Sequence, residues 1–131
     1  MPVTLALQVH TAMLAAARAA HPREACGLLL GKGSHVHTAT VAANVHPHPL
    51  HHFEIDPAAL IAAHKAARAG GAQMLGYWHS HPNGRAEPSA EDRAAASGDG
   101  RLWAIVASGA ISVWRDGADG FEALSYSVRD M

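Results

Sequence analysis

Apolar and polar positions divide the 131 residues into alternating helical and extended segments. Apolar residues at helical spacing and a run of alanines predict a first helix over residues 3–20, which Pro22 ends. The apolar run 25–31 predicts a buried strand, and the alternating run 34–45 predicts a second strand paired with it as a hairpin. A segment rich in proline and histidine follows over residues 44–52, here called the histidine loop.

The second half of the chain continues this alternation. Asp56 and Pro57 predict the start of a helix that ends near residue 69, because an acidic N-cap followed by proline is typical of helix starts. The remaining predicted elements are a strand over 73–78, a polar loop over 83–88, a short helix over 89–96, and strands over 102–107, 111–115 and 121–126. This order predicts one domain over residues 1–131, of mixed α/β class, with a single sheet layer flanked by helices.

Composition narrows the function classes. The chain has 10 basic and 11 acidic side chains, and a net charge of −1 argues against a nucleic-acid binder, which needs a basic surface. The single cysteine, Cys26, excludes an internal disulfide and fits a reducing compartment, so we expect a cytoplasmic protein. No apolar run approaches the ~20 residues that span a bilayer, and the first residues do not have the pattern of a secretory signal.

The chain contains 11 histidines, as many as its acidic residues together. His79 and His81 follow the predicted strand 73–78, and residues two apart on a strand project from the same face. Their ring nitrogens suit zinc, which in catalytic sites takes three protein ligands and keeps one position for water. Asp92 is the candidate third ligand. The alternative is that Ser89 and Asp92 form a capping box, with no metal involved.

These residues together match a known family. Glu24, then His79-x-His81, seven residues, Ser89, two residues and Asp92 resemble the JAMM signature of MPN-domain zinc metalloproteases. The surrounding segments resemble the short prokaryotic (Prok-JAB, peptidase M67-like) members: residues 22–29 around the glutamate, Asn44 with 53–57, and 76–82 around the histidines. The resemblance covers about residues 3–115.

The resemblance implies an MPN fold, α/β (α+β) in class, with a curved mixed sheet flanked by helices and similar to cytidine deaminase. It also implies that His79, His81 and Asp92 ligate Zn²⁺, with water as the fourth ligand. Glu24 would act as general base and later as general acid, and Ser89 would donate a hydrogen bond to the oxyanion. The chain would then be a hydrolase that acts as a metallopeptidase or isopeptidase.

The family also implies a substrate class. Its members cleave at the C-terminal tails of ubiquitin-like or sulfur-carrier proteins, and its deubiquitinating members carry two insertions that bind ubiquitin. Here only six residues separate Pro82 from Ser89, and a single helix joins Phe53 to Gly76, so those insertions have no room. We therefore expect a compact peptidase acting on a Gly-Gly-type tail, which would lie along a sheet edge as an added strand.

Neighbouring residues are interpreted as structural. Ser80 points away from the face of His79 and His81 and is expected to bond backbone, and Cys26 is expected to be a buried, inert thiol. Tyr77 and Trp78 are expected in the core or the groove wall.

Two alternatives stay open. One is a non-catalytic MPN scaffold, and the other is a histidine-rich metal-binding module formed by the hairpin and the histidine loop. That cluster spans residues 35–52 and comprises His35, His37, His46, His48, His51 and His52. We interpret it as a solvated segment. A nucleoside deaminase is excluded, because its Pro-Cys-x-x-Cys motif needs two cysteines.

Overall fold

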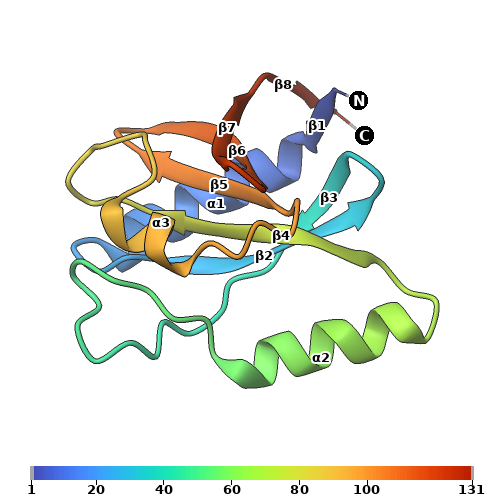
Figure 1. Cartoon of the computed structure of the whole chain (residues 1–131), viewed down its shortest axis with the longest axis horizontal. Coiled ribbons are helices and arrows are strands. Elements are labelled where there is room, and N and C mark those ends of the chain that lie inside the picture. The colour runs from blue at the N-terminus through green and yellow to red at the C-terminus, as the bar shows by residue number, and fades with distance from the viewer. Residues whose placement is uncertain (1, 131) are drawn as a thin grey trace.

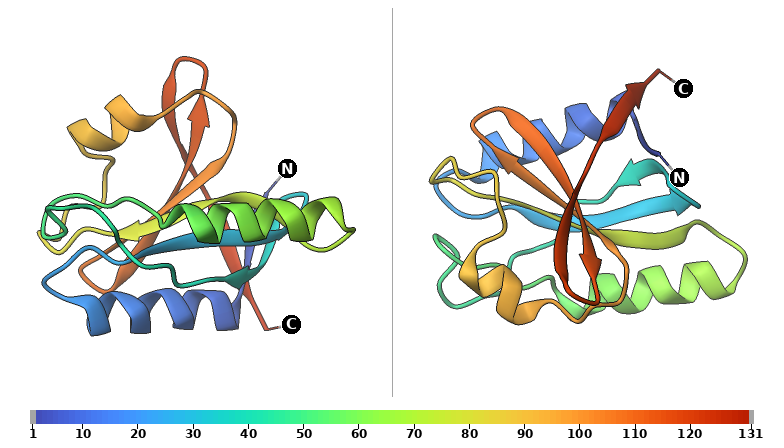
Figure 2. Two further views of the ribbon diagram at one scale, coloured as in Figure 1. Left: turned by 90° about the horizontal axis from the view of Figure 1, so that it is seen from below. Right: turned by 45° about the horizontal axis from the view of Figure 1, so that its top comes forward.

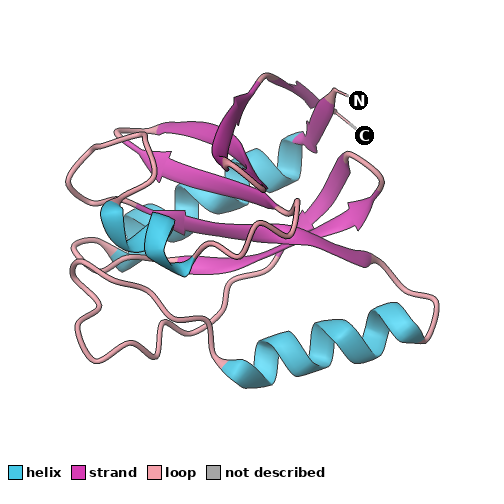
Figure 3. Cartoon of the chain, in the orientation of Figure 1, coloured by secondary structure: helices cyan, strands magenta, loops and turns pink. Residues whose placement is uncertain are grey.

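A computed structural model describes residues 2–130 (Figure 1). Its helices are α1 (Leu7–Ala20), α2 (Pro57–Arg68) and α3 (Ala90–Ala95). Its strands are β1 (Val3–Ala6), β2 (Cys26–Lys32), β3 (His35–Ala39), β4 (Gln73–Ser80), β5 (Leu102–Ala107), β6 (Ala110–Gly117), β7 (Gly120–Leu124) and β8 (Tyr126–Arg129). Figure 3 shows that long loops join the helices to the sheet on the side where α3 lies. In the described residues, no helix has both the length and the apolar character needed to span a membrane.

The strands form one mixed sheet in the order β7-β6-β5-β4-β2-β3-β1-β8. Strand β4 lies inside this sheet, antiparallel to β2 and parallel to β5. The sheet curls strongly, and the ribbon of β6 and β7 crosses over its middle in the right view of Figure 2. The expected curved mixed sheet flanked by helices is confirmed.

Each face of the sheet is covered by a different helix, as the left view of Figure 2 shows. Helix α1 packs against one face in a cluster that includes Leu29, Trp78 and Val106. Helix α2 packs against the other face, over a smaller cluster that includes Cys26 and Leu28. Since side chains alternate along a strand, β2 and β4 contribute to both clusters. The candidate site described below lies at the end of β4, on the face of the sheet that α2 covers.

The N-terminal prediction was wrong at its start. Residues 3–6 form strand β1 and not the first turn of the helix. This strand pairs in parallel with β3 on one side and β8 on the other. Val3 and Leu5 are almost completely buried there. The partners of β1 are far away in the sequence: His35, opposite Thr4, comes 31 residues later, and β8 lies at the other end of the chain. Nothing in the local sequence indicates this pairing, so the helical spacing dominated the prediction.

Two other strand predictions were too long. The strand predicted over 34–45 ends at Ala39, after which Ala42 and Asn44 make only isolated bridges. The strand predicted over 121–126 is divided at Ser125 into β7 and β8, which lie on opposite edges of the sheet. In both cases the alternation of apolar and polar residues continues past the point where the strand ends or changes its partner. The alternation predicts extended structure but not which strand it pairs with, so the predicted boundaries were wrong.

Candidate metal centre and catalytic cleft

The candidate site lies where β4 ends beside the start of the antiparallel strand β2. His79 is the second-last residue of β4, its register partner is Cys26, and His81 follows the strand directly. Ser80 points to the other face, where its Oγ accepts a hydrogen bond of 2.8 Å from the Ala25 N–H. This confirms the structural interpretation of Ser80. The bond also fixes the segment that carries Glu24 beside the two histidines.

Helix α3 brings the candidate acid to the same point. Asp92 lies in its first turn, is 4% exposed, and directs Oδ2 at both histidines. The Nε2 atoms of His79 and His81 are 2.9 Å apart, and each lies 3.1 Å from Asp92 Oδ2. Three side chains from two separate elements therefore meet at one buried point.

Hydrogen bonds alone cannot satisfy this triangle of atoms. Each Nε2 carries at most one proton. If only one Nε2 is protonated, the lone pair of the other Nε2 faces a lone pair of Asp92 Oδ2, which is repulsive. If both Nε2 atoms are protonated, their two N–H groups point at each other, which is also repulsive. Ligands bound tetrahedrally at ~2.0–2.1 Å from a zinc ion lie roughly 3.3 Å apart, close to the spacing found here. The donor set therefore fits a metal ion.

Glu24 lies next to this triangle. Its carboxylate and the ligand nitrogens of His79 and His81 all fall within 4.8 Å of one another, and all three residues are buried. Two acids thus compete for the third ligand position. Asp92 Oδ2 lies 3.1 Å from both nitrogens, which makes Asp92 the candidate third ligand and Glu24 the adjacent acid.

The surroundings orient the two histidines differently. Arg85 O lies 2.8 Å from His81 Nδ1, so a proton on Nδ1 donates to this carbonyl and leaves the Nε2 lone pair free for a metal. His79 Nδ1 is buried without a hydrogen-bond partner among residues 2–130. The ring of Phe53 stacks on His79 instead, with centroids 4.2 Å apart, and holds the plane of the imidazole.

Burial and charge shift the pKa values at the site in different directions. Burial raises the pKa of the Glu24 carboxyl to about 7; His81 opposes this rise and the Asp92 carboxylate adds to it. Burial alone would also raise the pKa of Asp92, but bonds from His79, His81 and Ser89 hold it well below its usual range. Asp92 therefore stays ionised, while Glu24 can gain and lose a proton near neutral pH.

Ser89 forms the capping box considered as an alternative. Its Oγ accepts a 3.0 Å bond from the Asp92 N–H, and its own N–H donates 2.9 Å to Asp92 Oδ2. The cap and the metal interpretation are compatible, because the cap orients the same Asp92 oxygen that faces the histidines. A hydroxyl that accepts one bond can still donate another, so the Ser89 proton is available to a ligand in the cleft.

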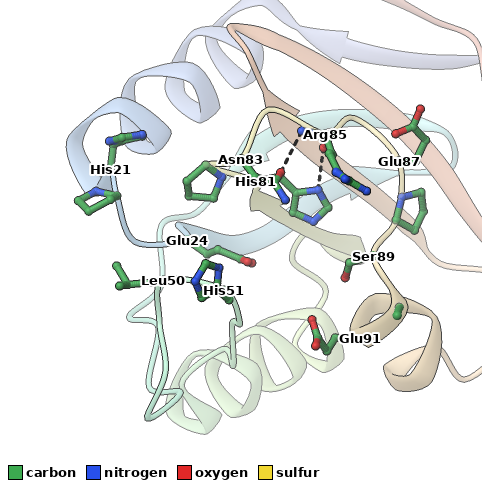
Figure 4. Close-up of a pocket in the computed structure, with 14 residues that line it drawn as sticks. His21, Glu24, Leu50, His51, His81, Asn83, Arg85, Glu87, Ser89 and Glu91 are labelled. Carbon is green, nitrogen blue, oxygen red and sulfur yellow. Dashed lines mark hydrogen bonds between the residues drawn. The ribbon is translucent and has the colours of Figure 1, made fainter.

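An open cleft of about 870 Å³ runs past Glu24, His81 and Ser89 (Figure 4). Leu50 and His51 of the histidine loop line one side of this cleft, so the loop flanks the candidate site. A second hollow of about 450 Å³ also reaches Glu24 and Ser89, and continues to Tyr77. The cleft thus lies between the histidine loop and α3.

The loop histidines themselves are arranged differently from the pair on β4. The His46 and His52 rings stack with centroids 4.6 Å apart, and His48 lies 5.9 Å from His46. Stacked rings do not aim their nitrogens at a common point. Two further predictions are confirmed: Cys26 is buried with a pKa raised by burial to about 11, and Trp78 is fully buried with its Nε1 bonded to Thr40 O.

Sequence reasoning missed two contributors to the site. Asn44 was identified only as part of a segment resemblance, although its side chain contacts the backbone of Glu24. Phe53 was identified in the same way, although its ring covers His79. The sequence distance from Asn44 or Phe53 to the two histidines does not predict a contact between them. Irregular loop segments and α2 lie in between, and the lengths of such loops vary freely.

Comparison with known proteins shows the family to which this chain belongs. Residues 6–117 match the family of prokaryotic homologs of the JAB domain. A desampylase from Haloferax volcanii is 34% identical over 111 residues, which cover 82% of this chain and 79% of the relative. The chain belongs to the prokaryotic JAB family, and so to the JAMM/MPN class of hydrolases.

Other similar proteins agree. A protein of Thermus thermophilus named a probable TtuB-protein conjugate cleaving protease is 42% identical over 71 residues, 54% of this chain and 47% of that protein. The solution structure of a Desulfitobacterium hafniense protein superposes with a TM-score of 0.86 at 33% identity, covering 98% of this chain and 94% of that one. A JAB1/MPN domain protein from Archaeoglobus fulgidus shares the fold, with a TM-score of 0.66, 20% identity, and coverage of 98% and 97%.

Proposed function

We propose that this protein is a zinc-dependent isopeptidase or peptidase that cleaves at the C-terminal tail of a ubiquitin-like or sulfur-carrier protein. The observation that carries the proposal is the convergence of His79, His81 and Asp92 within 3.1 Å, with Glu24 beside them. The named activities of the Haloferax and Thermus relatives support the choice of substrate. The enzyme would act in the cytoplasm, on protein and not on nucleic acid.

His79, His81 and Asp92 would hold the zinc ion. When bound, zinc acts as a Lewis acid on a carbonyl oxygen and lowers the pKa of a coordinated water to about 7. Asp92 supplies the negative charge of the ligand set and stays ionised through its bonds to both histidines and Ser89. Arg85 O keeps His81 in the tautomer that presents Nε2.

Glu24 would act as the general base and then as the general acid. It takes the proton from the attacking water and returns it to the leaving amine. Burial raises its pKa to about 7, close to the pH at which proton transfer in both directions is efficient. A cation held by its neighbours favours the ionised form, which is the form needed for the first transfer.

Ser89 would stabilise the oxyanion that forms when the carbonyl carbon becomes tetrahedral. Its Oγ stays fixed because the capping bond from the Asp92 N–H holds it at the cleft wall. The hydroxyl proton then donates to the developing negative charge. A tail of glycines would lie in the cleft between the histidine loop and α3, where Glu24 and Ser89 both reach the bound backbone.

The proposal is tested by incubating the zinc-loaded protein with a ubiquitin-like or sulfur-carrier protein fused through its C-terminal glycines to a reporter. Mass spectrometry should show cleavage directly after the terminal glycine. Glu24→Gln should retain one zinc per chain and lose about 10²- to 10⁴-fold in rate, which is the usual contribution of a general base. No cleavage by the zinc-loaded wild type would favour the scaffold alternative, and equal cleavage rates for the wild type and Glu24→Gln would contradict the role of Glu24 as the base.

A further inference from the structure

The backbone of Glu24 is held by the histidine loop at both of its polar groups. Its N–H donates 2.7 Å to Pro49 O, and its C=O accepts a 2.9 Å bond from Asn44 Nδ2. The sheet holds the chain only from the next residue onward, where Ala25 bonds to Ser80. The position of the Glu24 backbone is therefore set by the loop across the cleft as well as by β2.

Asn44 uses every hydrogen-bonding position of its amide. Nδ2 donates to Glu24 O and, at 3.0 Å, to His52 O. Oδ1 accepts from the His46 N–H at 3.1 Å and from the Glu54 N–H at 3.0 Å. A primary amide has two donor protons and an acceptor oxygen with two lone pairs, so the side chain is saturated.

The four bonds of Asn44 have two structural roles: they shape the segment around the histidine loop, and they attach it to the backbone of Glu24. Three of them close the histidine loop on itself, by tying residue 44 to residues 46, 52 and 54. The fourth crosses to Glu24, 20 residues earlier in the chain. The same loop presents Leu50 and His51 to the cleft (Figure 4). The loop wall and the proposed base are thus linked through one amide.

We propose that Asn44 is a positioning residue for Glu24: its amide holds the backbone that carries the base and ties this backbone to the histidine loop. This inference rests on the proposed function, in which Glu24 moves the proton. A displacement of about 1 Å at a reacting group can cost on the order of 100-fold in rate.

The test uses Asn44→Asp and Asn44→Ala in the full-length chain. Asn44→Asp keeps the shape and the acceptor oxygen but replaces the Nδ2 donor with an oxygen facing the carbonyls of Glu24 and His52. We expect kcat to fall by about 10- to 100-fold with KM within about twofold, because the base moves and the cleft remains. Gln8→Ala is the matched control, since Gln8 also donates its amide to a backbone carbonyl, that of His37, away from the cleft.

A double-mutant cycle separates positioning from a merely structural role. In the Glu24→Gln background, Asn44→Asp should lower the residual rate by less than about twofold, because the group through which it acts is already absent. If the two losses multiply instead, Asn44 acts independently of Glu24 and the inference is wrong.

Amide hydrogen exchange of the metal-free protein gives a readout that needs no activity. In Asn44→Ala and Asn44→Asp, the Glu24 N–H should exchange at least about 10-fold faster, while Ala104 in β5 keeps its wild-type rate. Unchanged exchange at Glu24, or wild-type kcat in both variants when Glu24→Gln is inactive, would overturn the inference alone. An active Glu24→Gln would instead overturn the proposed function.

Discussion

Two groups of histidines in this protein show what turns an imidazole into a metal ligand. His79 and His81 are 0% and 6% exposed, converge to 2.9 Å, and share one carboxylate. The histidine loop and the hairpin before it hold six histidines, of which His46 and His52 merely stack. The smaller group is the candidate centre. Number and density of histidines are therefore poorer guides than the backbone that carries them.

The difference comes from the supporting structure. Strand β4 is bonded on both sides, by β2 and β5, so the i and i+2 positions of its end are fixed in direction. The histidine loop is held by the Asn44 amide, by the isolated bridge between Asn44 and Ile55, and by scattered backbone bonds such as the one from the Glu24 N–H to Pro49 O. A strand end paired on both sides suits coordination, because its side chains have fixed directions that scattered loop bonds do not provide.

The largest expected effect tests this contrast directly. His79→Ala should weaken zinc binding by at least about 100-fold, because it removes a ligand from a buried set of three. His35→Ala, in the hairpin, should leave zinc affinity unchanged. Competition with a chromophoric chelator measures both affinities. Similar losses in the two variants would erase the distinction between the groups.

Ser89→Ala should lower kcat by about 10²–10³-fold if its hydroxyl donates to the oxyanion. It should also cost about 1 kcal/mol of folding free energy, the usual loss for a helix N-cap. Asp56→Ala is the matched control, because Asp56 caps α2 through the Ala58 N–H and lies outside the cleft. Denaturant titration and steady-state rates should show equal stability losses but a rate loss only for Ser89. A full rate in Ser89→Ala would reduce this residue to a cap.

Glu24→Gln should stabilise the metal-free protein at alkaline pH. Burial raises the pKa of Glu24 from 4.5 to about 7, so between these values the folded state binds a proton that the unfolded state has lost. Stability of the wild type therefore falls as pH rises through this window and stays low above it. The difference between these two pKa values corresponds to about 3 kcal/mol, and a neutral glutamine removes this loss of stability.

Urea unfolding of the two metal-free proteins at pH 5 and pH 8 checks this prediction. The variant should gain on the wild type mainly at pH 8. An equal difference at the two pH values would mean that the Glu24 carboxyl does not titrate in this range.

The smallest expected effect concerns the histidine loop. Replacing His46, His48, His51 and His52 together by asparagine should leave one tightly bound zinc per chain. Native mass spectrometry measures this stoichiometry. A loss of the ion in this variant would make the loop, and not β4, the metal site.

The end of β4 and its pair of histidines could be predicted from the sequence, because the alternation of side chains along one strand is a local property. This alternation predicts His79 and His81 on one face and Ser80 on the other. Asp92 could be proposed as the third ligand from its place in the short helix after His81, but Glu24 required the family resemblance, because the hairpin, the histidine loop and α2 separate it from β4 in the sequence. Strand β1 and the division of β7 from β8 depend on partners far along the chain. The four bonds of Asn44 were also hidden, because a loop asparagine gives no indication of which carbonyl groups it reaches.

The most direct test of the account is a crystal structure of the zinc-loaded protein with anomalous data at the zinc edge. We predict one strong peak in contact with His79 Nε2, His81 Nε2 and Asp92 Oδ2, with Glu24 beside it and beyond ligand distance. A peak held by Glu24, His79 and His81 without Asp92, or a peak on the histidine loop, would contradict the assignment of ligand and base.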